Sequence, residues 1–158
     1  MGKEIERKYR LVKGLEKFLE IGPTRRIEIT QGYLSFDPEV RVRLKKEEGK
    51  VKATLTIKGK GELVRDEFEY EIPVEEACEL LRMCGEAVIK KTRWVVERWE
   101  IDIFHEKLSG LVLVERELES EDEEVGFPEG VEVVEVTSDS RYKNKNLARL
   151  KSLRELGI

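Results

Sequence analysis

The chain has 158 residues, of which 41% are charged and 39% hydrophobic, and 34 acidic residues nearly balance 30 basic ones to leave a formal net charge of −4. This balance argues against a general nucleic-acid-binding protein, which is usually basic overall, and no apolar run approaches the roughly 18 residues that a membrane-spanning helix needs. Two cysteines are too few for a disulfide framework, and the N-terminal segment, charged from Lys3 onward, lacks the apolar core of a signal peptide. We therefore expect one domain over residues 1–158, in the cytoplasm, with no specific nucleic-acid or membrane partner; a homodimer is left open.

Strands dominate the first half of the chain. Side chains there alternate between apolar and polar, which is the period of a half-buried β-strand. The predicted strands are residues 2–11, 25–36, 40–47, 50–59 and 62–73, and the predicted helices are residues 13–21 and 74–84. Gly49 separates the third and fourth strands as a hairpin turn, and Pro73 ends the fifth strand.

The second half continues the pattern and adds a helix at the end. Strands are predicted at residues 87–97, 98–105, 111–119 and 131–136, with an acidic loop at 120–130. A helix is expected from about Asn144 to Leu156. Eight or nine successive antiparallel strands with few helices favour a mainly β fold, either a sandwich or a closed barrel.

Charged side chains occupy one face of strand after strand. In the segment EIERKY, residues 4–9, the side chains of Glu4, Glu6 and Lys8 fall on one face of a strand, and later strands repeat this arrangement. An antiparallel sheet with one face in water produces the same alternation. Neighbouring like charges on one face repel and add nothing to strand stability, however, so a bound ligand would explain them better.

If the charged faces point inward, the sheet encloses a hydrophilic tunnel that needs ligands to neutralise it. Clustered Lys and Arg suit the oxygens of a polyanion, and clustered carboxylates suit hard cations such as Mg²⁺ or Mn²⁺. A metal-bound polyphosphate satisfies both groups at once. Glu4 and Glu6 would then hold the metal, and Lys8 would hold phosphate.

The segment EIERKY also resembles the ExExK motif of the CYTH domain, the family of triphosphate tunnel metalloenzymes. Further segments resemble the family's motifs in the same order: RVR at 41–43, TIKG at 56–59, RDEFEYEI at 65–72, KTR at 91–93, EIDIF at 100–104, LVLVERE at 111–117 and VTSDSRYKNKNLA at 136–148. The resemblance implies a closed eight-stranded antiparallel β-barrel around a hydrophilic tunnel, with a C-terminal helix at one mouth. It also implies metal-dependent chemistry on triphosphates.

Position by position, the resemblance implies three groups of site residues. The metal ligands are Glu4, Glu6, Glu115 and Glu117, with Asp102 as a looser match. The substrate-binding residues are Lys8, Arg41, Arg43, Lys58, Lys91 and Arg93, with Arg141 as a looser match. Catalytic roles fall to Glu4, Glu6 and Lys8, and to Glu67 and Glu69, which would position water or a second metal ion.

The implied activity is hydrolysis of inorganic triphosphate or of a nucleoside triphosphate with Mg²⁺ or Mn²⁺. A class IV adenylate cyclase, which converts ATP to cyclic AMP and pyrophosphate, resembles the same barrel, and the shared motifs do not separate the two. Thiamine triphosphatase activity is a narrower option. A non-catalytic polyphosphate-binding module would need only the basic residues, so the acids argue against it. We expect the lone histidine, His105, to be structural or exposed.

Overall fold

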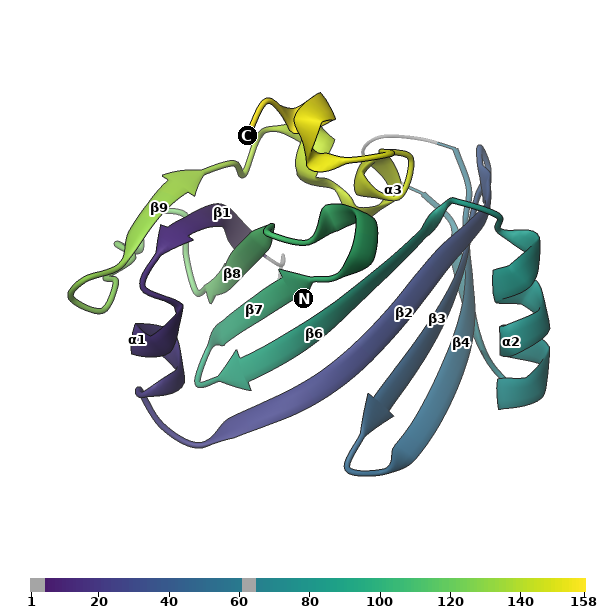
Figure 1. Ribbon diagram of the computed structural model, residues 1–158, viewed down its shortest axis with the longest axis horizontal. Helices are drawn as coiled ribbons and strands as arrows, with labels where there is room; N and C mark the ends of the chain where they lie inside the picture. The colour runs from purple at the N-terminus through teal and green to yellow at the C-terminus, as the bar shows by residue number, and fades with distance from the viewer. Residues whose placement is uncertain (1–4, 61–64) are drawn as a thin grey trace.

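Nine strands form one continuous antiparallel sheet in the computed structural model, which describes residues 5–60 and 65–158 (Figure 1). The strands are β1 (Ile5–Lys13), β2 (Thr24–Phe36), β3 (Glu39–Glu47), β4 (Lys50–Lys58), β5 (Glu67–Ile72), β6 (Val88–Val96), β7 (Trp99–Phe104), β8 (Val112–Leu118) and β9 (Glu132–Glu135). The helices are α1 (Leu15–Leu19), α2 (Val74–Met83) and α3 (Asn144–Leu147), with the 3-10 turns η1 (Glu106–Leu108), η2 (Ser140–Tyr142) and η3 (Leu153–Leu156). None of the helices in the described ranges is both long and apolar enough to cross a lipid bilayer.

The mainly β antiparallel fold that the sequence predicts is confirmed, although the sheet differs in detail from an eight-stranded closed barrel. The strand order is β5-β4-β3-β2-β6-β7-β8-β1-β9, so β5 and β9 are the end strands. Over the described residues the sheet is therefore curled and not strictly closed. Strand β5 begins at Glu67, later than residue 62, where the sequence pattern places its start; residues 61–64 lie outside the described part of the chain.

The long C-terminal helix expected from Asn144 to Leu156 is wrong. Helix α3 ends at Leu147, and η3 begins only at Leu153. A capping box at Ser152, whose side chain and that of Glu155 bond reciprocally to backbone N–H groups, starts this second turn afresh. Packing explains the apolar spacing that suggested a helix, because Leu147, Leu150, Leu153 and Leu156 all contact one hydrophobic cluster.

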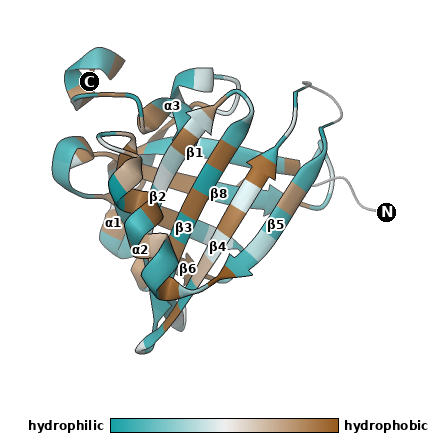
Figure 2. Ribbon diagram, turned by 90° about the vertical axis from the view of Figure 1, so that its right-hand side faces the viewer, coloured by the Kyte–Doolittle hydropathy of each residue, from teal (hydrophilic) through white to brown (hydrophobic). Residues whose placement is uncertain are grey.

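The outer face of the sheet is apolar and carries the helices. Figure 2 shows the alternation of hydrophobic and hydrophilic residues along β3 and β4, with α2 beside them. Helix α2 packs closely on β2. A Cβ atom on Gly32 of β2 would lie only 2.7 Å from Sγ of Cys84, the residue that caps the C-terminal end of α2. Further round the sheet, Phe18 of α1 is fully buried against Trp99 of β7. These contacts leave the inner face for polar side chains.

One end of the inner face is closed by the C-terminal segment, residues 136–158, drawn in yellow-green to yellow in Figure 1. Tyr142 and Leu147 of this segment pack with Tyr33, Ile89 and Phe104 of β2, β6 and β7, and all five side chains are buried. Fully burying one such side chain contributes about 1.5–3 kcal/mol. The segment is therefore held firmly across the sheet, and the charged part of the inner face begins next to it.

Candidate active site

Strand register gathers the charged side chains of the inner face into one cavity of about 830 Å³. Residues directly opposite each other on neighbouring strands project to the same side of a sheet; Lys8 lies opposite Glu115, and Tyr33 lies opposite Arg41. The basic residues that line the cavity are Lys8, Arg41, Arg43, Lys58, Arg65, Arg93, Lys143 and Lys145. The acidic residues are Glu6, Glu39, Glu100 and Glu115. Cations outnumber carboxylates two to one, so the cavity suits a polyanion.

The basic wall of this cavity is formed by neighbouring arginines of β3 and by their contacts. Arg43 Nε donates to Gln31 Oε1 at 2.5 Å, and Arg41 Nη2 reaches Thr56 Oγ1 at 3.4 Å. Burial, together with the positive charges of Arg41 and Arg93, lowers the pKa of Arg43 to about 10. Neither acceptor is a carboxylate, so these two cations keep their charge for a ligand.

Beneath the cavity, Asp102 of β7 links two cations of β6. Its carboxylate accepts two hydrogen bonds from Arg93, at 2.8 and 3.0 Å, and lies 2.8 Å from Lys91 Nζ. Burial works against ionisation, but Lys91 and Arg93 hold the pKa of Asp102 well below its usual range. Burial also lowers the pKa of Lys91 to about 8, although Asp102 opposes that shift. Asp102 therefore has the contacts of a counter-ion.

Two lysines of the sheet, Lys8 of β1 and Lys91 of β6, bond to the C-terminal segment. Lys91 Nζ lies 3.2 Å from Asn144 Oδ1, and Lys8 Nζ donates to the backbone oxygen of Tyr142 at 3.1 Å. Lys8 also pairs with Glu115 at 3.4 Å. Since Asn144 itself lines the cavity, these contacts fix one end of the site against the strands.

Carboxylates face one another on the opposite wall. Glu6 of β1 lies directly opposite Glu117 of β8, and Glu100 of β7 lies directly opposite Glu115. Like charges in this arrangement destabilise a sheet, and all four residues line a second, smaller cavity of about 200 Å³ that adjoins the first. Oxygen donors of this kind suit a hard divalent cation. Among the described residues, no three acidic, histidine or cysteine side chains already converge as a metal cluster.

Comparison with models of known protein families shows which family this chain belongs to. The model of the CYTH domain matches residues 2–150. The chain belongs to the CYTH domain family. The resemblance carried by EIERKY and the later motifs is confirmed.

Relatives of this CYTH protein share nearly its whole length. An inorganic triphosphatase of Acetivibrio thermocellus is 40% identical over 157 residues, covering 94% of this chain and 95% of the relative. An inorganic triphosphatase of Nitrosomonas europaea is 34% identical over 151 residues, covering 92% and 96%. The crystal structure of an inorganic triphosphatase matches with a TM-score of 0.73 at 30% identity, covering 96% of this chain and 98% of the other.

The structure of this CYTH protein brings most of the predicted site residues together, but not all of them. Glu6, Lys8, Arg41, Arg43, Lys58, Arg93 and Glu115 line the main cavity, and Glu117 lines the adjoining one. Glu4 lies outside the described residues. Glu67 and Glu69 are exposed on the end strand β5, where Glu69 accepts a hydrogen bond from Thr56 at 3.0 Å. Arg141 is exposed and bonded to Asp139, so its side chain does not line the cavity.

Several lining residues of the CYTH cavity were missed by the sequence reasoning. Arg98, Glu100 and Asp102 stand at every second position, so the alternation of charged residues could have placed Glu100 on the inner face. Glu39 likewise precedes Arg41 and Arg43 at every second position, although it falls one residue before the predicted start of the strand; it is buried and lies 3.8 Å from Lys58. Lys143 and Lys145 are cationic, but only the fold of the C-terminal segment brings them to the cavity.

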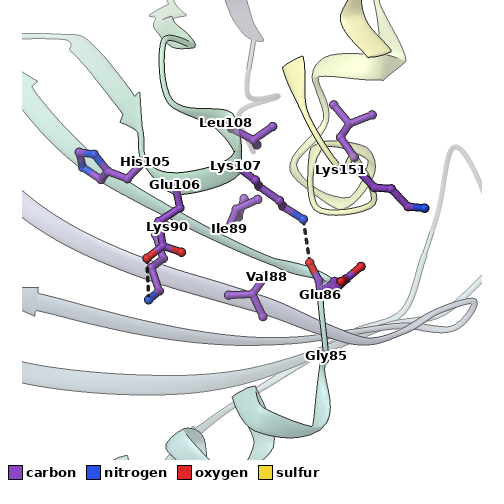
Figure 3. Close-up of a pocket in the computed structure, with 11 residues that line it drawn as sticks. Gly85, Glu86, Val88, Ile89, Lys90, His105, Glu106, Lys107, Leu108 and Lys151 are labelled. Carbon is purple, nitrogen blue, oxygen red and sulfur yellow. Dashed lines mark hydrogen bonds and ion pairs between the residues drawn. The ribbon is translucent and has the colours of Figure 1, made fainter. Parts of the chain in front are cut away.

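A separate cavity of about 460 Å³ lies beside β6, between η1 and the C-terminal segment (Figure 3). Lys107 Nζ donates to the backbone oxygens of Glu86 and Ala148, at 2.7 Å each, and Lys90 pairs with Glu106 at 3.2 Å. Through Lys107, the backbone of Ala148 in the C-terminal segment is linked to η1 and to Glu86, just before β6. Nearby, His105 is exposed and lies 2.7 Å from the hydroxyl of Thr92.

Proposed function

We propose that this CYTH protein hydrolyses inorganic triphosphate to pyrophosphate and phosphate with the help of a divalent cation. The observation that carries the proposal is the single cavity in which Arg41, Arg43 and Arg93 lie together with the carboxylates Glu6 and Glu115. The two curated relatives named inorganic triphosphatases, similar to this chain over almost its whole length, support the choice of substrate.

Substrate binding falls to the basic wall. One guanidinium group can donate two parallel hydrogen bonds to phosphate oxygens, and an ammonium group acts as a point charge. Arg41, Arg43 and Arg93 would hold the phosphates from the strands, and Lys8 and Lys58 would neutralise the remaining charge. Lys91, which lies beneath the cavity and shares Asp102 with Arg93, would add its positive charge from there. Cations aimed at the transferred phosphoryl group also stabilise the charge of its transition state.

The acidic wall fits a divalent cation by its donor chemistry. Glu6, Glu115 and Glu117 present carboxylate oxygens from adjacent strands, and the motif adds Glu4 to this set; a bound cation would relieve the repulsion between directly opposed carboxylates such as Glu6 and Glu117. We propose Mg²⁺ or Mn²⁺. When bound, such a cation neutralises phosphate oxygens and lowers the pKa of water. Asp102 is left out of this set, because both of its oxygens already accept hydrogen bonds from Arg93.

Water is the nucleophile in this proposal. No serine, cysteine or histidine is among the described residues that line the cavity, and its carboxylates and lysines are assigned above to the metal ion and the phosphates, so the proposal needs no covalent intermediate. Water would attack the terminal phosphorus in line with the leaving pyrophosphate. Glu100, which lines both cavities, would orient that water; Glu69, which accepts a hydrogen bond from Thr56 on end strand β5, is a second candidate.

The test follows products after the purified protein is incubated with inorganic triphosphate, thiamine triphosphate or ATP, with Mg²⁺ and Mn²⁺ separately. We expect phosphate release chiefly from inorganic triphosphate and little cyclic AMP from ATP. Cyclic AMP with pyrophosphate would instead favour the cyclase, and tight triphosphate binding without turnover would favour a binding module.

Two variants sharpen the test. Glu6→Gln should remove turnover while triphosphate still binds to the basic wall. Glu79→Gln alters an exposed carboxylate on α2, far from either cavity lining, and should leave turnover unchanged. Full activity of Glu6→Gln would overturn the metal assignment.

A further inference from the structure

Gln31 is a fully buried polar side chain at the point where the inner face of the sheet changes from buried apolar residues to charged ones. It lies in the middle of β2 on the inner face and is 0% exposed. On that face Ile29 lies two residues before it and Ile89 lies directly opposite on β6, whereas Arg43 lies directly opposite on β3. A buried amide costs free energy unless its polar atoms are bonded. An aliphatic residue would be the cheaper choice for packing alone.

Both ends of the Gln31 amide are bonded to side chains that line the candidate active site. Oε1 accepts from Arg43 Nε at 2.5 Å, and Nε2 donates to the hydroxyl of Tyr33 at 2.8 Å. Arginine can only donate, so the carbonyl end of the amide must face Arg43. The amide thus joins two residues of the cavity wall through one rigid, buried group.

The contact with Gln31 fixes the plane of the Arg43 guanidinium and leaves its charge intact. Holding Nε leaves the two terminal nitrogens of Arg43, the pair that binds phosphate oxygens in a fork. The acceptor is neutral, in contrast to Asp102, a carboxylate that pairs with Arg93 through two hydrogen bonds. Arg43 is thereby oriented by a hydrogen bond but is not paired with a carboxylate.

We propose that Gln31 is a positioning residue for substrate: it aims Arg43 at a phosphate group of the triphosphate without neutralising it. This inference rests on the proposed function, since it concerns the same cavity. Gln31 does not line the cavity and touches no substrate. Its effect reaches the substrate only through Arg43.

The experiment compares two substitutions that separate orientation from charge. Gln31→Glu keeps the shape and the acceptor but neutralises Arg43, so KM for triphosphate should rise roughly tenfold, with a weaker dependence on salt. Gln31→Met removes the acceptor and keeps the charge, so KM should rise a few-fold with unchanged salt dependence. Gln31→Met should have no further effect in an Arg43→Lys background, because lysine lacks the Nε group.

Thr92→Val is the matched control, because Thr92 is also a buried, doubly bonded polar residue, but on the outer face of β6. It should lower the melting temperature and leave KM unchanged. Folded Gln31 variants with wild-type KM and wild-type salt dependence would overturn the proposal.

Dissociation constants for triphosphate, measured with a chelator present, keep this inference separate from the proposed function. If the wild-type protein binds triphosphate without hydrolysing it, the proposed function fails, and the same variants still test Gln31 through affinity. If it neither hydrolyses nor binds triphosphate, both proposals are overturned.

Discussion

Asp102 and Arg93 lie opposite each other on β7 and β6 and are joined by two hydrogen bonds, from Nε to Oδ1 at 2.8 Å and from Nη2 to Oδ2 at 3.0 Å. Lys91 adds a third contact to the same carboxylate at 2.8 Å. Asp102 and Lys91 are buried, and Arg93 opens to the cavity. The basic wall of the site is therefore built on one buried carboxylate.

Asp102→Asn should destabilise the fold strongly. The substitution keeps the shape of the side chain but leaves the buried Lys91 without its counter-charge and leaves Arg93 with the more distant Glu100, at 3.6 Å; breaking a buried pair in this way costs about 3–5 kcal/mol. Denaturation with urea measures the change in the free energy of unfolding. Glu47→Gln is the control, because Glu47 is only partly buried and pairs with the exposed Arg25, so its loss should matter far less. Equal effects of the two substitutions would contradict the assignment of Asp102.

The stabilisation by Asp102 should disappear in acid. Because Lys91 and Arg93 depress the pKa of Asp102 in the folded state, the unfolded chain binds the proton first as the pH falls. The contribution is fully present above the unfolded pKa of about 4 and is lost below it. The difference in unfolding free energy between the wild type and Asp102→Asn should thus be constant above about pH 5 and shrink toward pH 3. A difference that grew in acid would have the wrong sign.

The pairing of Asp102 also shows where sequence reasoning stops. The alternation of charges places Arg93 and Asp102 on polar faces of successive strands, which the structure bears out. Which residues stand opposite depends on strand register, which hairpin geometry sets and one sequence does not reveal. Without the register, the resemblance could only mark Asp102 as a loose match to a metal ligand. In the structure its contacts with Arg93 and Lys91 are those of a counter-ion.

Other differences have similar physical causes. Gln31 is hidden in the sequence because it occupies a position between Ile29 and Tyr33 that reads as part of an apolar stripe. The C-terminal segment was expected as one helix from its leucine spacing, but tertiary packing on Tyr33 and Phe104 satisfies the same residues in short turns. Glu67 and Glu69 were expected inside the barrel, and the order of the strands places them on end strand β5.

Glu117→Gln should stabilise the metal-free protein and weaken metal binding. Glu117 and Glu6 are directly opposed, and removing one charge of such a pair gains up to a few tenths of a kcal/mol. Melting curves in a chelator should therefore rise slightly, and the further rise caused by Mn²⁺ should become smaller than in the wild type. Glu132→Gln alters an exposed acid on β9 and should retain the full response to Mn²⁺. An unchanged Mn²⁺ response in Glu117→Gln would remove this residue from the metal site.

Lys143 and Lys145 should strengthen substrate binding by charge. Both line the cavity from the C-terminal segment, and Lys143 is exposed while Lys145 is half-buried. Replacing each by Gln should raise KM for triphosphate about two- to fivefold, because each would pair with a phosphate group in a position where solvent partly screens the interaction.

Salt distinguishes this charge effect from a loss of structure. The KM values of the wild type and of Lys143→Gln/Lys145→Gln should converge as ionic strength rises toward about 1 M, where the screening length falls to roughly 3 Å. Lys151→Gln is the matched control from the same segment, since Lys151 lies beside the separate cavity of Figure 3 and not in the site. A difference in KM that persists at high salt would mean that the two lysines act by shaping the segment, and equal KM values at low salt would mean that the phosphates bind only to the strands.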